Sequence, residues 1–231
     1  LDAVDRIIGG LEKKNKKIKP REKKTIAYHE AGHASVSWLL EHANPLVKVT
    51  IVPRGQTLGA AWYLPEERQI TTKAQLLDQM VSLLGGRAAE ELVFGEVSTG
   101  ALNDLERVTK QAYAMVVYYG LDKEIGNLSF YDSSGQSEYG FQKPFSEKTA
   151  EKIDAQIRTM VEEAYEKAKS LLKDNREKLD ALAQILVERE VIFREDVEAI
   201  YGPRPWDAEK ETKEDASQIK NEESESTDEN A

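Results

Sequence analysis

The pentapeptide HEAGH occupies residues 29–33, inside a segment (24–41) whose apolar residues recur at helical spacing. Residues four positions apart lie one above the other on a helix, so His29 and His33 can bind one metal ion together. Glu30 would then face the open coordination position, where it can accept a proton from water activated by the metal. This arrangement predicts a zinc site in which Glu30 acts as general base.

A coincidental match to this pattern is improbable. The chain contains only three histidines, so a spurious pair four apart with a glutamate beside the first is expected roughly three times in a thousand. Gly32 supports the prediction, because glycine inside a helix costs about 1 kcal/mol relative to alanine. The close approach of another backbone or of a ligand would explain its presence.

The third protein ligand is not decided by spacing. Catalytic zinc keeps three protein ligands and one open position, and a chain without cysteine has no thiolate ligand, disulfide or cysteine nucleophile. His42 lies roughly two and a half turns beyond His33, too far along the helix axis to close the site. The third ligand should therefore be a carboxylate from another helix, with Glu90, Glu91 and Asp104 as candidates.

The rest of the chain is predicted to be mostly helical. Helices are expected at 72–94, 101–119, 146–173, 176–189 and 196–201, and the glycines at 9 and 10 indicate a helix end in Leu1–Leu11. Residues 46–52 and 59–64 are typical of two short strands, and 126–143 of a loop or short hairpin. The apolar faces of 146–173 and 176–189 fit either an intramolecular hairpin, which we favour for most of this surface, or an assembly contact. The predicted fold is mainly α with one small β element.

Composition and charge narrow the possible functions. The 231 residues are 40% hydrophobic, enough for a sizeable core, and no apolar run is long enough to span a membrane. Residues 207–231 carry ten acids and three lysines and are expected to form a solvated, disordered tail. Eight basic residues in 11–24 have no interleaved aromatic residue, so we interpret them as a linker and disfavour nucleic-acid binding. The first residue, Leu1, indicates an excised fragment.

Three motifs in order resemble the FtsH-type AAA metalloproteases: YHEAGHA at 28–34, GGRAAEE at 85–91, and STGA at 98–101 followed by Asp104. The resemblance runs from about Leu1 to Trp206 and implies a helical asp-zincin fold. It implies that His29, His33 and Asp104 bind Zn²⁺, that Glu30 is the general base, and that Glu90 orients a ligating histidine. It also implies an edge strand beside the zinc that pairs with extended substrate, formed by Gly59, Ala60, Ala61, Trp62, Tyr63 and Leu64.

The resemblance also implies a domain plan. Residues 1–10 would end an ATPase module, 11–24 form the basic linker, 25–206 the zinc peptidase domain and 207–231 the acidic tail. ATP would be used, and the membrane reached, only through N-terminal parts that this chain lacks.

The family further implies polypeptide substrates and a hexameric ring of identical or related subunits. The motif GPRPW at 202–206, followed by the acidic tail, resembles the matrix-facing (m-AAA) proteases of the mitochondrial inner membrane. The alternative location is the cytoplasmic side of a bacterial plasma membrane. The alternative function is a non-catalytic helical ring-assembly module with a vestigial metal site. The presence of Glu30 and of all three implied ligands argues for activity.

Overall fold

The computed structural model describes residues 19–53, 59–64, 69–131, 144–204 and 206. Within these residues the chain forms six α-helices and one three-stranded sheet, which confirms the mainly α fold with a small β element. The predicted helix end at Leu1–Leu11, residues 11–18 of the basic linker and the tail from 207 lie outside the described residues. In the part of the chain that is described, no helix combines the length and hydrophobicity needed to cross a membrane.

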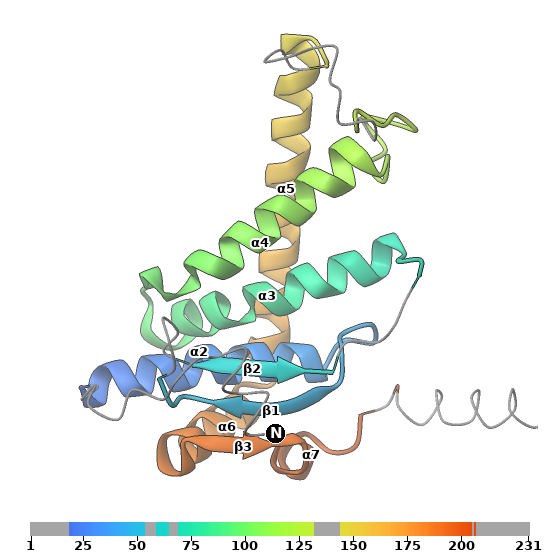
Figure 1. Ribbon diagram of the computed structural model, residues 1–231. Helices are drawn as coiled ribbons and strands as arrows, with labels where there is room; N and C mark the ends of the chain where they lie inside the picture. Colours follow the sequence, from blue (N-terminus) through green and yellow to red (C-terminus); the bar gives the residue numbers. More distant parts are fainter. Residues whose placement is uncertain (1–18, 54–58, 65–68, 132–143, 205, 207–231) are drawn as a thin grey trace, which may run out of the picture.

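The helices are arranged around a stack of three. In Figure 1, α2, α3 and α4 lie one above another, and the long helix α5 rises behind them. The sheet lies on the other side of α2 from α3, and α6 and α7 lie beside it. The bounds are α2 Pro20–Trp38, α3 Lys73–Phe94, α4 Leu102–Tyr113, α5 Glu147–Asp174, α6 Arg176–Arg189 and α7 Arg194–Tyr201.

Local signals in the sequence explain where α2 and α3 begin and end. Helix α2 starts at Pro20, four residues earlier than predicted, because proline suits the first turn, where its missing N–H is not needed. Helix α3 starts after Thr72, whose hydroxyl accepts from the Gln75 N–H while the Gln75 side chain accepts from the Thr72 N–H. It ends at Gly95, whose positive φ of 68° suits the left-handed cap.

The predicted helix at 101–119 is divided into three pieces. A 3₁₀ turn, η1 (Thr99–Ala101), leads into α4, and a π-helical turn, η2 (Ala114–Tyr118), follows it. Three consecutive residues of η2, Met115 to Val117, are all buried. An α-helix with a single buried face does not bury three neighbours in a row, so the change of winding accompanies a change in what the segment packs against.

The sheet has the order β2-β1-β3, with all pairs antiparallel. Strands β1 (Leu46–Thr50) and β2 (Ala60–Tyr63) confirm the two predicted strands within a few residues. Strand β3 (Val191–Phe193) was not predicted, because three residues between two helices are too short for an alternating pattern. It forms by pairing with β1, and β2 is left at an edge of the sheet beside α2 (Figure 1).

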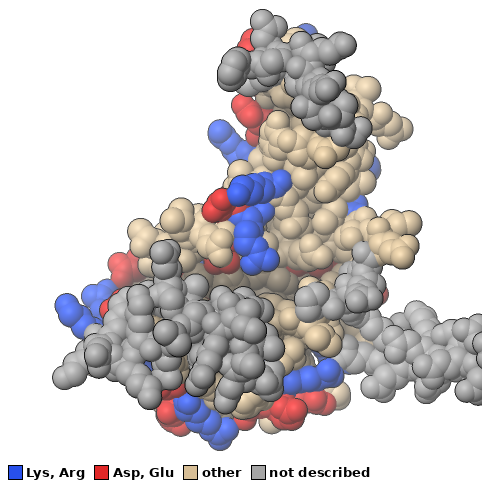
Figure 2. All heavy atoms as spheres, in the orientation of Figure 1, with Lys and Arg blue, Asp and Glu red and all other residues tan. Residues whose placement is uncertain are grey.

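The apolar faces of α5 and α6 are used within the chain. Helix α5 packs against α3, and α6 packs against α2. The buried residues on these faces include Ile153, Met160, Ala164, Leu172, Leu179, Leu182 and Leu186. Their outer faces carry charges of both signs, including the pairs Lys169–Glu166 and Arg176–Asp180. Figure 2 shows basic and acidic side chains interspersed on the face that it presents. Most of this apolar surface therefore belongs to the core of the domain.

Candidate metal centre

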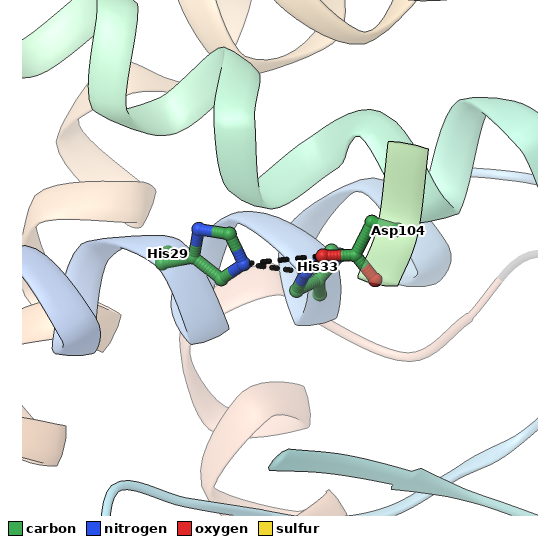
Figure 3. Close-up of side chains that lie close together, drawn as sticks. All are labelled: His29, His33 and Asp104. Atoms are coloured by element: carbon green, nitrogen blue, oxygen red, sulfur yellow. Dashed lines mark hydrogen bonds and ion pairs between the residues drawn. The ribbon is translucent and has the colours of Figure 1, made fainter. Parts of the chain in front are cut away.

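Three side chains from two helices converge on one point. His29 and His33 come from α2 and Asp104 comes from α4 (Figure 3). The two imidazole Nε2 atoms lie 3.1 Å apart, and Oδ2 of Asp104 lies 3.4 Å from Nε2 of His29 and 3.5 Å from Nε2 of His33. Among the described residues this is the cluster of His and carboxylate side chains arranged to hold a metal ion.

The dimensions of this triangle fit zinc. Two ligand atoms that are each 2.0–2.1 Å from a tetrahedral zinc ion lie about 3.3–3.4 Å from one another. The three measured separations bracket that value. Two imidazole nitrogens and one carboxylate oxygen also form the donor set of a catalytic zinc site with one position left open.

Helix α2 is buried along the length that carries the motif. His29, Glu30 and His33 are each less than a tenth exposed. At Gly32, a β-carbon would lie 2.4 Å from the carbonyl oxygen of Gly85 on α3, so the two helix backbones are in direct contact. This confirms the expectation that another backbone approaches Gly32 closely, and it brings α3 within reach of both imidazoles.

Helix α3 contacts each imidazole at Nδ1, the ring nitrogen that faces away from the metal position. Nδ1 of His33 lies 2.9 Å from the carbonyl oxygen of Ser82, to which only a protonated Nδ1 can donate. Nδ1 of His29 lies 2.7 Å from Oε1 of Glu90. With the protons on Nδ1, both Nε2 lone pairs are free to bind a metal ion.

Glu90 also links His29 to the segment that carries Asp104. Its Oε2 accepts from the backbone N–H of Ser98 at 2.6 Å, and its Oε1 accepts from the Ser98 hydroxyl at 3.0 Å. The Ser98 hydroxyl in turn accepts from the Gly100 N–H, which caps η1 at the start of α4. One buried carboxylate therefore positions a histidine and the entrance to the helix of Asp104.

The other candidate ligands lie elsewhere. Glu91 faces α5, where it accepts hydrogen bonds from Tyr165 and Lys169. His42 follows α2, and its backbone N–H donates to Asp78. Of the three carboxylates that spacing left open, Asp104 lies at the Nε2 atoms, and Glu90 lies at the opposite nitrogen of His29.

Burial and contact with opposite charge set the ionisation of the cluster. Burial lowers the pKa of His29, but hydrogen bonds with Asp104 and Glu90 outweigh this effect and raise that pKa to about 10. Burial raises the pKa of Asp104, yet its contacts with His29 and His33 hold it well below the usual range. Burial raises the pKa of Glu30, and the nearby histidines offset only part of that rise. Asp104 is therefore ionised, as a metal ligand must be, and Glu30 binds protons more readily than an exposed glutamate.

The residue that precedes the edge strand β2 contacts Glu30, the predicted general base. A β-carbon on Gly59, the residue before β2, would lie 2.6 Å from Oε1 of Glu30 and 2.8 Å from its Cγ. The Gly59 backbone is therefore packed against this side chain. The predicted strand residues Ala60, Ala61, Trp62 and Tyr63 form β2, and Leu64 follows it, with its N–H bonded to the Pro45 carbonyl.

Three residues of the site were not predicted from the sequence: Gly86 as a close backbone neighbour, the Ser82 carbonyl and Ser98. Gly59 was predicted as part of the edge strand, but its contact with Glu30 was not. Ser82 acts through its backbone, which has no signal in residue type. Gly86 belongs to a Gly-Gly pair inside a helix, and the helix-propensity cost used to single out Gly32 applies equally to it.

Comparison with known proteins agrees with this geometry. Residues 16–200 match the model of Peptidase family M41. The chain is 64% identical over 206 residues to an ATP-dependent zinc metalloprotease FtsH of Parabacteroides distasonis, covering 89% of this chain and 30% of that protein. It is 55% identical over 209 residues to the FtsH of Rhodothermus marinus, covering 88% of this chain and 30% of that protein.

A mitochondrial relative is also similar. The mouse inner-membrane m-AAA protease component AFG3L2 is 48% identical over 204 residues, covering 88% of this chain and 25% of that protein. The chain thus spans between a quarter and a third of the length of these relatives. Because the family model covers most of the chain and these identities are high, the chain belongs to peptidase family M41 and corresponds to the proteolytic domain of FtsH-type zinc metalloproteases.

Proposed function

We propose that the chain is a zinc endopeptidase domain in which His29, His33 and Asp104 bind the metal and Glu30 is the general base. The observation that carries the proposal is the triangle of two Nε2 atoms and one Oδ2 atom with edges of 3.1, 3.4 and 3.5 Å. Glu30 lies within the same buried segment of α2. A zinc ion bound there would supply Lewis-acid polarisation of the scissile carbonyl and acidify a water molecule.

The protein's own residues then handle the proton. Glu30 takes it from the attacking water and returns it to the leaving amine, which requires a carboxylate that can be protonated and deprotonated in each cycle. Burial raises the pKa of Glu30 and suits it to this exchange. Glu90 and the Ser82 carbonyl keep the two imidazoles in one tautomer and orientation, which maintains the geometry of the site through turnover.

The substrate would lie along β2. This strand is at the edge of the sheet, and Gly59 just before it touches Glu30. An extended polypeptide that adds to a sheet edge is held through its main chain and needs no particular sequence. We therefore infer cleavage of unfolded segments with broad specificity, the segment Gly59–Leu64 being the docking strand.

The parent protein would be an ATP-dependent protease in a membrane, assembled as a hexamer of identical or related subunits. Support comes from the names of the relatives, which include ATP-dependent zinc metalloproteases and a component of the mitochondrial inner membrane. Residues 1–10 would end the ATPase module, 11–24 would link it to the peptidase domain, and 207–231 would form the acidic tail. The higher identities to the bacterial proteins favour the cytoplasmic side of a bacterial plasma membrane over the mitochondrial location that GPRPW at 202–206 suggests.

The rival function is a ring-assembly module with a vestigial metal site. A site that does not catalyse a reaction would not need a general base. Glu30 is nevertheless buried next to two histidines whose Nδ1 atoms are both hydrogen-bonded. Burying a carboxyl group is costly. Its retention favours catalysis.

The deciding experiment is Glu30→Gln in the zinc-loaded chain, assayed with a short unstructured peptide so that no unfolding machinery is needed. The amide keeps the size of the side chain but cannot accept the proton, so we expect hydrolysis to fall by at least about a hundredfold with zinc content unchanged. Glu22→Gln, the same substitution at an exposed position of α2, is the control and should remain active. Hydrolysis by Glu30→Gln at the rate of the control would reject the proposal.

A further inference from the structure

One face of α3 covers both imidazoles. Ser82, Gly86 and Glu90 follow one another at intervals of four residues, so they lie in a row on the same side of the helix. The Ser82 carbonyl is hydrogen-bonded to Nδ1 of His33, and the Glu90 carboxylate to Nδ1 of His29. Gly86 lies between them.

At Gly86 there is no space for a side chain. A β-carbon there would lie 2.5 Å from Nε2 of His29 and 2.6 Å from Nε2 of His33, the two atoms that face the metal position. Non-bonded heavy atoms pack at about 3.5 Å or more. A methyl group at this point would therefore force both nitrogens to move by the better part of an ångström.

The imidazoles cannot move that far without losing other contacts. Both rings are buried, and each is tied through Nδ1 to the helix that would carry the methyl group. A push on Nε2 acts against these two hydrogen bonds, so it would tilt or rotate the rings. Zinc requires Nε2 at about 2.0–2.1 Å, and a binding constellation tolerates errors of about 0.5 Å.

We propose that Gly86 is a positioning residue of the metal centre, whose missing side chain leaves the room in which the two Nε2 atoms meet one metal ion. The proposal rests on the zinc site of the proposed function and adds a residue that binds nothing itself. The proposal gives the two glycines of the Gly-Gly pair different roles. Gly85 contacts the backbone of α2 at Gly32 and serves the helix crossing, whereas Gly86 contacts only ends of ligand side chains among its nearest neighbours.

The first test is zinc binding by Gly86→Ala in the full 231-residue chain, measured with zinc alone by competition with a chelating dye. We expect affinity at least about a hundredfold below wild type, at the upper end of what loss of one outer partner causes, because two ligands are displaced. Gly95→Ala, at the C-cap of the same helix, is the control. Its β-carbon would meet no heavy atom within 4 Å, so its zinc affinity should stay within about tenfold of wild type.

The second test needs no metal and detects the contact directly. In the wild-type background, Gly86→Ala should lower the thermal midpoint of the zinc-free chain, because the methyl group strikes both rings. In the His29→Ala/His33→Ala background the rings are gone, and the same substitution should raise the midpoint, since alanine is the better helix former. A Gly86→Ala variant that fails to fold is covered by this comparison, because the triple variant should fold.

Two results would overturn the proposal. One is wild-type zinc affinity in Gly86→Ala. The other is an equal decrease in the thermal midpoint when Gly86→Ala is made in the wild type and in the His29→Ala/His33→Ala variant. Absence of zinc binding by the wild-type chain would instead overturn the proposed function. The sign reversal in the zinc-free chain would still report on Gly86.

Discussion

Glu90, which is buried, and Asp104, which is partly buried, are acids that contact the same histidine. Isosteric replacement of each distinguishes a metal ligand from a residue that orients a ligand. Asp104 Oδ2 lies 3.4 Å from Nε2 of His29 and 3.5 Å from Nε2 of His33, whereas Glu90 Oε1 lies 2.7 Å from Nδ1 of His29. Asp104→Asn and Glu90→Gln each remove one charge and keep the shape of the side chain. We expect zinc to be lost far more readily from the first.

The magnitude follows from these positions. Glu90 acts on the metal through one imidazole, and loss of such a partner typically costs about 10–100-fold in metal affinity, or about 1.4–2.8 kcal/mol. Asp104 would supply one of the three direct bonds, so its loss should exceed that range, to about a thousandfold or about 4 kcal/mol. Glu90→Gln keeps an oxygen that can accept from the Ser98 N–H, which limits its effect on folding.

The assay is a chelator titration of each zinc-loaded variant, with bound zinc counted at each step and helicity followed by circular dichroism. Glu106→Gln, on the same helix as Asp104 but at a side chain 54% exposed, should release zinc at the wild-type chelator concentration. If Glu90→Gln releases zinc first while Asp104→Asn retains it, the roles are reversed. Equal release from both would mean that the two acids contribute equally to zinc binding, which would refute the distinction between ligand and orienting residue.

Two further predictions concern packing and pH. Gly32→Ala should lower the unfolding free energy by about 2 kcal/mol or more and the thermal midpoint by about 4–8 °C. The reason is that its methyl group would meet the Gly85 carbonyl oxygen at 2.4 Å, between two helix backbones that cannot move apart freely. An unchanged melting curve would show that the helices can separate at no cost. In the zinc-free chain, the raised pKa of His29 (about 10, against about 6.5 when unfolded) stabilises the fold fully below pH 6.5, and this contribution is lost as pH rises towards 10. The thermal midpoint should therefore fall across that window, and His29→Gln should flatten the decline; an equal decline in that variant would assign it to other groups.

Zinc affinity should show the opposite dependence on pH over the same window. The proton on His29 competes with the metal, so apparent affinity should rise by up to about tenfold per pH unit until the pKa of about 10 is reached. A dye-competition titration at several pH values measures this slope. Affinity that is independent of pH would mean that His29 binds the metal without releasing a proton.

Much of the helical framework could be predicted from the sequence because its signals are local. The capping pair Thr72 and Gln75 marks the start of α3, and the bounds of α6 were predicted without error. Strand β3 could not be predicted, because its three residues become a strand only by pairing with β1. The π turn after α4 likewise depends on what the segment packs against.

The same division holds at the metal centre. The helical period alone places His29 above His33, and it puts Glu30 beside them, since all three belong to one α-helix. Spacing left Glu90, Glu91 and Asp104 as equal candidates for the third ligand, and only a resemblance to a known family ranked them. The packing of α3 against α2, α4 and α5 places Asp104 at Nε2, Glu90 at Nδ1 and Glu91 against α5. Which nitrogen a carboxylate reaches, and where a helix leaves no room for a methyl group at Gly86, depend on contacts between segments distant in the chain, and only the tertiary structure decides them.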